Sequence, residues 1–159
     1  MDSSLPICHL TGTEPLVADD EELRTIRRYV EAGGVLFIDV CGGAKSFGDS
    51  ARRAVSRAFP DRPLEAIPTD HKLLSASQPG MFDLSRRHVR TFTKESVPDQ
   101  AGVFEILSAG KGHVIFTRLD VTSGFLGTET WGIIGYAPEY CGKFMQNLIL
   151  WTFDGQQDE

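Results

Sequence analysis

VLFIDVCGG, residues 35–43, is the segment most informative about the fold class. It joins a continuous apolar, β-branched run to a Cys-Gly-Gly turn, and only Asp39 interrupts the run. Strands that are apolar on both faces are typical of parallel sheets covered by helices. The stretch therefore predicts a buried strand of an α/β sheet, which ends in a turn that presents Cys41.

A helix is predicted on each side of this strand along the chain. Asp19 and Glu22 have the spacing of a capping box, which predicts a helix start, and Gly33-Gly34 predicts its end. A second helix is predicted at about 47–59, and a short strand at 5–10. Strands and helices that alternate over such short links predict an α/β fold, here a three-layer sandwich with a mainly parallel sheet.

The C-terminal half adds further elements. Strands are predicted at 64–67, 87–93, 103–109 and 113–119. The last two flank Gly110-Lys111-Gly112 and therefore predict a β-hairpin. A closing helix is predicted to begin near Pro138 or Glu139. Residues 1–154 are expected to form one domain, and residues 155–159 a polar tail.

The composition excludes several functional classes. The chain has 159 residues, of which 41% are apolar and 24% charged, and its formal net charge is −6. A binder of nucleic acid or of anionic membranes normally carries a basic face. No apolar run reaches the roughly 18–20 residues of a membrane helix, and no signal-peptide pattern opens the sequence. We therefore expect no nucleic-acid partner and no membrane insertion by this chain.

The three cysteines, Cys8, Cys41 and Cys141, are widely spaced and do not have the spacing of metal ligands. The glycine-rich stretch 124–135 has neither the Walker pattern nor a dinucleotide-binding pattern. We therefore expect no metal and no cofactor. Unpaired thiols suit a reducing compartment, which makes a cytoplasmic location the default expectation.

Cys41 is the most informative single residue. Ligands of open α/β sheets bind beyond the carboxyl ends of the strands, where Cys41 is predicted to lie. Nearby helix N–H groups would favour its thiolate, and Gly42 would leave the sulfur approachable. The alternative is a small buried residue that packs beneath a glycine-rich turn.

The segment IDVCGG, which ends the strand predicted at 35–40 and follows a Thr-Gly loop earlier in the chain, resembles part of the class I glutamine amidotransferase-like superfamily. In that superfamily a Gly-x-Cys-x-Gly nucleophile elbow follows a strand. The resemblance implies a nucleophile position for Cys41, the second elbow glycine for Gly43, and an oxyanion loop at Thr11-Gly12. Asp39 stands where the first glycine of the elbow would be, which is a departure from the pattern.

Three blocks, at 11–43, 59–74 and 117–151, resemble the bacterial family called domain of unknown function 4159. The resemblance implies a flavodoxin-like, amidotransferase-like fold, and it supplies no substrate. Family members commonly carry another strand and helix before the first block, often within longer secreted or membrane-linked proteins. A form that lacks this first strand-helix unit is therefore expected, and an extracytoplasmic location is the alternative if the chain is part of such a protein.

Amidotransferases of this superfamily carry a late His-x-Glu pair, in which the histidine is the general base for the cysteine. The corresponding stretch here, GYAPEYCGKF, keeps Pro138 and Glu139 but has Ala137 at the histidine position. Because alanine cannot accept a proton, we do not expect ordinary glutaminase activity.

His71 is the best histidine candidate for a functional role, because the neighbouring Asp70 could orient its imidazole. Asp70 could instead cap a short helix that starts at His71. His9 lies inside a predicted strand, and we expect it to be a packed, hydrogen-bonded residue.

Asp120 follows a predicted strand and opens the glycine-rich loop, where it could bind a ligand hydroxyl or act as a base. The alternative is a turn that holds its own backbone. Trp131 in the same loop could be a platform for a sugar or a ring, or could fill the core.

Three hypotheses for the function follow. The first is a non-catalytic ligand-binding or interaction module whose partner is a small molecule or a protein. Its crevice would be formed by Thr11, Gly12, Cys41, Gly42, Asp120 and Trp131, and Gly43 and Glu139 are further candidates for ligand binding. The second is a hydrolase or transferase with Cys41 as nucleophile and His71 or Asp120 as base. The third, from similarity to trehalose-utilisation-type relatives, is a carbohydrate-directed module. An exposed sheet edge would also support a homo-oligomer.

Overall fold

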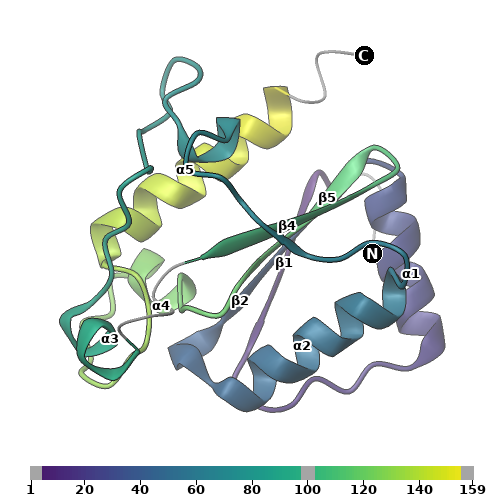
Figure 1. Cartoon of the computed structure of the whole chain (residues 1–159), viewed down its shortest axis with the longest axis horizontal. Coiled ribbons are helices and arrows are strands. Elements are labelled where there is room, and N and C mark those ends of the chain that lie inside the picture. Colours follow the sequence, from purple (N-terminus) through teal and green to yellow (C-terminus); the bar gives the residue numbers. More distant parts are fainter. Residues whose placement is uncertain (1–4, 98–102, 155–159) are drawn as a thin grey trace.

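The computed structural model describes residues 5–97 and 103–154, and a mixed sheet lies at its centre (Figure 1). Among the described residues the sheet has five strands, in the order β1-β2-β5-β4-β3. The strands are β1 (Ile7–Gly12), β2 (Val35–Val40), β3 (Glu65–Ala66), β4 (Phe104–Ala109) and β5 (Gly112–Thr117). The predicted polar tail, 155–159, lies outside the described residues.

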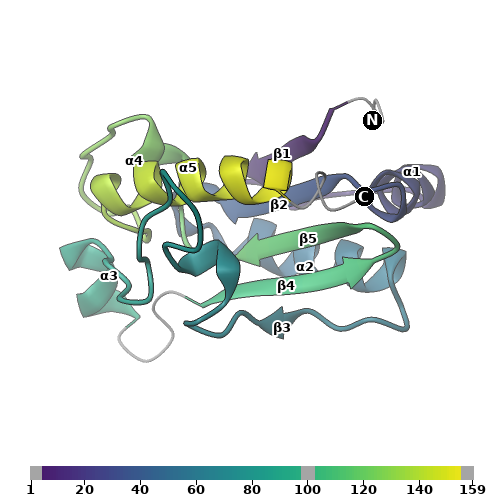
Figure 2. The same cartoon turned by 90° about the horizontal axis from the view of Figure 1, so that it is seen from above.

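Helices cover both faces of the sheet. They are α1 (Asp20–Glu31), α2 (Lys45–Ala58), α3 (Thr91–Ser96), α4 (Thr122–Phe125) and α5 (Pro138–Asp154), with single 3₁₀ turns at Cys41–Gly43 and Lys72–Leu74. Figure 2 shows α2 and α5 on opposite faces of the sheet. Within the described part of the chain, no helix combines the length and the apolar character needed to cross a membrane.

The first helix begins as the sequence predicts. The Asp19 carboxylate accepts hydrogen bonds from the backbone N–H groups of Glu21 and Glu22, at 2.8 and 2.9 Å. The Glu22 carboxylate in turn accepts the Asp19 N–H at 2.9 Å, which completes a capping box. The capping box satisfies N–H groups that the first helical turn leaves free, and it fixes where α1 starts.

Strand β2 is buried along its whole length and supplies both cores. Leu36, Ile38 and Val40 pack with α1 and α2, whereas Val35 and Phe37 pack with α5. Successive side chains of a strand point to opposite faces, so the continuous apolar run reflects burial on both sides. By the same alternation, the next residue on the α5 face of the strand is Asp39.

The predicted mainly parallel sheet is wrong. Strands β1, β2 and β5 are parallel, but β4 is antiparallel to β5 and β3 is antiparallel to β4. The cause is the predicted hairpin at Gly110-Lys111, which the structure confirms, because so short a connection can only join antiparallel strands. The flavodoxin-like, amidotransferase-like sandwich implied by resemblance is therefore not the architecture of this sheet.

The strand predicted at 87–93 is also wrong. Val89 makes only an isolated bridge to Tyr136, and the chain then turns into α3. The buried Thr93 hydroxyl accepts the N–H of Gly135 at 2.7 Å and donates to the carbonyl of the same residue at 3.0 Å. These contacts with a segment far away in the sequence stabilise a helical turn where the local alternation favours a strand.

The hairpin packs closely against the end of α1, and this contact has a testable consequence. A Cβ atom on Gly112 would overlap the carbonyl oxygens of Val30 and Gly34. We expect Gly112→Ala to lower the free energy of unfolding by about 3 kcal/mol, because backbone atoms must shift. The matched change Gly142→Ala, in open space on α5, should raise it by about 0.5–1 kcal/mol. Urea denaturation of both variants checks this, and equal stabilities would contradict the packing described.

Candidate functional site

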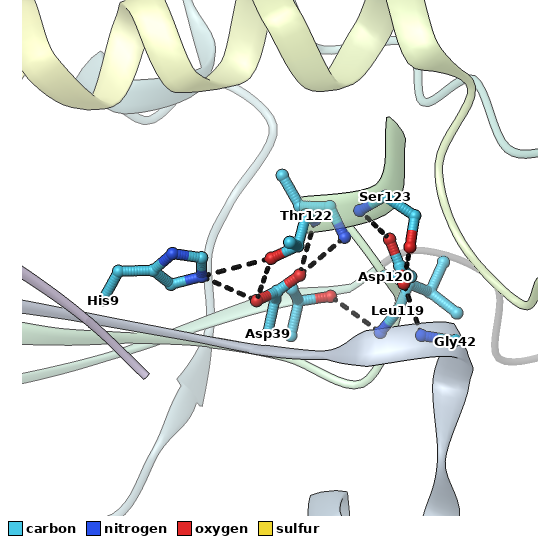
Figure 3. A network of polar contacts seen from close by, with 9 residues as sticks. His9, Asp39, Gly42, Leu119, Asp120, Thr122 and Ser123 are labelled. Atoms are coloured by element: carbon cyan, nitrogen blue, oxygen red, sulfur yellow. Dashed lines mark hydrogen bonds and ion pairs between the residues drawn. The ribbon is translucent and has the colours of Figure 1, made fainter. Parts of the chain in front are cut away.

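Two buried carboxylates mark the carboxyl ends of the central parallel strands (Figure 3). Asp39 is the penultimate residue of β2, and Asp120 follows β5 by three residues. Because β2 and β5 are parallel neighbours, their carboxyl ends meet at one edge of the sheet. This edge is where ligands bind in open α/β folds.

The Asp39 carboxylate accepts four hydrogen bonds from groups on two other segments. One oxygen accepts the backbone N–H groups of Val121 and Thr122, both at 2.8 Å. The other accepts the Thr122 hydroxyl at 3.0 Å and lies 2.7 Å from His9 Nε2 on β1. Asp39 thereby joins β1 and β2 to the start of α4.

These hydrogen bonds determine the ionisation of Asp39. Burial alone would raise the pKa of this carboxyl, but the donors from His9, Thr122 and Val121 outweigh burial and hold the pKa below its ordinary value. The ionised form is therefore the one that the folded protein favours. A buried charge of this kind is tolerable because it is fully hydrogen-bonded.

The Asp120 carboxylate holds the Cys41 turn against the start of α4. It accepts the Ser123 N–H at 2.7 Å, the Ser123 hydroxyl at 2.8 Å and the Gly42 N–H. The backbone of Asp120 also bonds to the segment opposite, through Ile134 and Tyr136. The hydrogen-bonding capacity of this carboxylate is thus largely committed to structure.

The Cys41 turn depends on its two glycines. Gly42 and Gly43 have φ angles of 65° and 77°, in the left-handed region that glycine adopts without strain. A side chain at Gly43 would also overlap Ile134, whose N–H donates to the Gly42 carbonyl at 3.2 Å. The turn leaves Cys41 half-buried at the end of β2.

The environment of Cys41 favours the neutral thiol. Burial raises the pKa of Cys41, and the negative charge of Asp120 raises it further, while a hydrogen bond from Ser123 lowers it only in part. A reactive cysteine normally lies in a positive environment that lowers its pKa. Cys41 lies in the opposite kind of environment.

A cavity of about 250 Å³ opens beside this turn, and we call it the Cys41 cavity. Its lining residues come from the end of β2, the turn, α2, the segments that follow α3 and β5, and Ile134: Val40, Gly43, Lys45, Gly48, Val97, Arg118, Leu119 and Ile134. Cys41 belongs to the adjacent turn and is not one of the lining residues. Arg118 lies 2.7 Å from the carboxylate of Asp49. Lys45 and Arg118 are the charged residues of the lining, and both are cationic.

Thr11 and Gly12 end the neighbouring strand β1. Thr11 is exposed and lies opposite Asp39 in the strand register. Gly12 lies against the ring of Phe47, where a Cβ atom would overlap the ring. The structure therefore places both residues at the same edge of the sheet as Cys41, with Gly12 in a packing contact with α2.

His71 lies at the other end of the sheet. Its ring contacts Trp151 near the end of α5, at 5.9 Å between centroids, and Trp151 also contacts His113 at the start of β5. His71 Nδ1 accepts the Leu73 N–H at 3.2 Å, so the histidine caps a 3₁₀ turn. The structure does not bring His71 to Cys41 and Asp120.

Trp131 and Glu139 do not line the Cys41 cavity. Trp131 is 69% exposed and makes an edge-on contact with Phe92. Glu139 is exposed on the first turn of α5 and pairs with Lys143 at 2.7 Å, and this hydrogen bond lowers the pKa of Glu139. With His88 and Lys143 it borders a separate polar cavity of about 120 Å³.

Sequence reasoning did not predict that Asp39 and His9 pair with each other. His9 is hydrogen-bonded as expected, but its side chain is 34% exposed and its ring stacks on Phe37 at the sheet edge. The signal was present, because a carboxylate inside a strand buried on both faces requires several hydrogen-bond donors. Lys45 and Arg118 gave no comparable signal, since isolated basic residues are usually solvated.

These features define an α/β domain with a small, cationic cavity at the carboxyl edge of its parallel strands. In the described ranges, 5–97 and 103–154, no group of three His, Cys, Asp or Glu side chains could hold a metal ion. The chain belongs to the family described as domain of unknown function (DUF4159), whose model matches residues 3–153. A comparison with curated proteins gave no match.

The Asp39 network predicts both a stability change and its dependence on pH. Asp39→Ala should lower the free energy of unfolding by about 3 kcal/mol, because buried donors lose their acceptor. Since the folded pKa of Asp39 is depressed, its contribution is present above the unfolded value of about 3.9 and is lost as the pH falls through the folded value. Wild type should therefore lose more stability than Asp39→Asn between pH 6 and pH 3.

Chemical denaturation at several pH values checks this prediction. The exposed substitution Asp61→Asn is the matched control, and its stability should follow that of wild type at every pH. Equal pH dependence of wild type and Asp39→Asn would show that the Asp39 carboxylate does not contribute as described.

Proposed function

We propose that this domain is a non-catalytic module that binds a small anionic ligand in the Cys41 cavity. The observation that carries the proposal is the cavity itself, which places Lys45 and Arg118 beside the glycine turn at the carboxyl edge of the sheet. Its volume of about 250 Å³ suits a compact ligand such as a small carboxylate or a phosphate ester. The apolar part of the lining would contact the rest of the ligand.

The electrostatics of the cavity favour an anion. The Asp49 carboxylate accepts a hydrogen bond from Arg118, and this hydrogen bond and the Lys45 charge both lower the pKa of Asp49. Two cations therefore face one carboxylate, which leaves net positive charge. Helix α2 begins at Lys45, and Ala44 in front of it provides no side-chain cap, so the N–H groups of the first turn add to the positive potential.

The geometry supports binding better than catalysis. A nucleophile needs a base that activates it. The Asp120 carboxylate lies within hydrogen-bond reach of the Cys41 side chain, but it already accepts three other donors, and its charge and its hydrogen bond raise the pKa of the thiol. His71 and His113 contact Trp151 near the end of α5, far along the sheet from the turn. The raised pKa of Cys41 argues in the same direction.

In the alternative function, Cys41 is the nucleophile of a hydrolase or transferase. The turn supports this alternative, because Gly42 and Gly43 both adopt positive φ angles directly after the buried strand β2. The same feature supports the narrower proposal that the unit from β1 to Gly43 is related to the amidotransferase-like superfamily. The carbohydrate-directed alternative depends on Trp131, which is exposed but does not line the cavity.

Thermal denaturation in the presence of small anions tests the proposal. Inorganic phosphate and a series of mono- and dicarboxylates are the probes, and at least one should raise the melting temperature of the wild type. Arg118→Gln and Lys45→Gln should each weaken that anion about tenfold, because each removes a charge-assisted hydrogen bond. Cys41→Ala should retain the affinity.

Arg24→Gln is the matched control, since it removes an exposed positive charge from α1. No stabilisation by any anion would contradict the proposal. Loss of affinity in Cys41→Ala with retention in Arg118→Gln would favour the nucleophile alternative instead.

A further inference from the structure

The outer edge of β1 is unpaired within the described residues. β1 is the first strand in the sheet order and pairs with β2 on one side only (Figure 2). The Pro6 carbonyl accepts the Val35 N–H at 2.9 Å, so Pro6 points toward β2. Because successive residues of a strand alternate, the N–H and C=O groups of Ile7, His9 and Thr11 point away from the sheet.

This edge lacks the features that normally prevent strand pairing. Natural edge strands are blunted by lysine, proline, β-bulges or short length. The sequence of β1, ICHLTG, contains neither lysine nor proline, and its six residues follow β2 in unbroken register. The edge is therefore competent to accept another strand along its length.

A cavity lies next to β1, between Leu10, the segment 16–18 and the first turns of α1. We call it the α1 cavity, and its volume is about 420 Å³. Its apolar residues include Leu10, Leu16 and Ile26, and Val17 at its rim is 89% exposed. A cavity of this size accepts a side chain as large as leucine or phenylalanine.

The rim of the α1 cavity is acidic. Asp19, Glu21 and Glu22 line the cavity, and its lining contains no basic residue. Asp20 beside them pairs with Arg57 at 2.7 Å. The rim therefore favours a basic group on whatever enters the cavity, through complementary charge.

The same charges disfavour a second copy of this chain as the occupant. Each copy has a net charge of −6 and presents the same acidic rim next to β1. Pairing two such edges would bring like charges together, whereas a basic partner would neutralise them. Complementarity of charge thus distinguishes the two occupants.

We infer that the outer edge of β1 and the α1 cavity together bind an extended peptide segment of a partner protein. The peptide adds a strand to β1 through the outward groups of Ile7, His9 and Thr11. One apolar side chain of the peptide enters the α1 cavity, and a lysine or arginine nearby contacts the acidic rim. Addition of a strand to an open sheet edge is an established mode of peptide recognition, in which backbone hydrogen bonds provide affinity and pockets provide specificity. This site is separate from the Cys41 cavity and does not depend on the anion-binding proposal.

Selection from a phage-displayed library of random nonapeptides on the whole chain tests the inference. The enriched peptides should combine apolar residues in alternate positions with at least one lysine or arginine, and they should lack proline in the paired segment. A synthetic copy of one such peptide then serves as the probe in fluorescence polarisation and in hydrogen exchange. Its binding should slow exchange at the amides of Ile7, His9 and Thr11.

Two variants separate the charge from the cavity. Glu21→Arg should weaken the synthetic peptide about tenfold or more, whereas Glu95→Arg, an equal charge change on the exposed face of α3, should leave its affinity within about twofold. Thr25→Trp, which fills the α1 cavity from its wall, should weaken binding without reversing a charge. Circular dichroism establishes that each variant is folded.

Three results would overturn the inference. The first is that no peptide is enriched. The second is that the peptides bind Glu21→Arg and Thr25→Trp as tightly as they bind the wild type. The third is that light scattering gives the mass of a dimer and that hydrogen exchange at the Ile7, His9 and Thr11 amides is already slow without peptide. The last result would assign the edge to a second copy of the chain.

Discussion

The hydrogen bonds of the buried Asp39 carboxylate are the interaction on which the carboxyl edge of this domain depends. Asp39 lies in a strand that is covered on both faces, so its charge can be maintained only if several donors reach it. Donors from Val121, Thr122 and His9 satisfy it, and they bring the start of α4 and the edge strand β1 to the end of β2. Asp120 repeats the arrangement one strand further on, where it holds the Cys41 turn. The Cys41 cavity opens beside the turn that Asp120 holds in place, and both carboxylates already accept hydrogen bonds from several donors.

Local sequence patterns predicted most of the elements but not the direction of the sheet. The capping box at Asp19, the buried strand at 35–40 and the hairpin at Gly110 are each specified by residues close together in the chain, and the structure contains all three. A mainly parallel sheet was expected because the chain alternates strand and helix around 35–40, and β1, β2 and β5 are indeed parallel. The hairpin then reverses the chain. The helix at 91–96 was missed because Thr93 is held by Gly135, a contact between distant segments that no local pattern encodes.

The candidate site was predictable in part. Cys41, Gly42 and Asp120 meet at the carboxyl edge because strand ends converge there in any open α/β sheet. The hydrogen bonds of Asp39 follow from the rule that a buried carboxylate needs several donors, which depends on burial and not on sequence spacing. That Lys45 and Arg118 line one cavity is evident only from the three-dimensional structure. Sequence proximity was misleading for His71, since the carboxylate beside it in the chain does not place it near Cys41.

The rate of alkylation of each cysteine as a function of pH reports whether the Cys41 turn favours the neutral thiol or the thiolate. We expect Cys41 to react slowly at neutral pH, with a rate that rises only above the ordinary thiol pKa of 9.0, because burial and the Asp120 charge raise the pKa of Cys41. Cys141, whose pKa burial raises to about 12, is the slow reference within the same molecule. Asp120→Asn should move the Cys41 profile to lower pH. Rapid alkylation of Cys41 near pH 6, unchanged by Asp120→Asn, would show that the turn favours the thiolate and would establish it as the position of a reactive nucleophile.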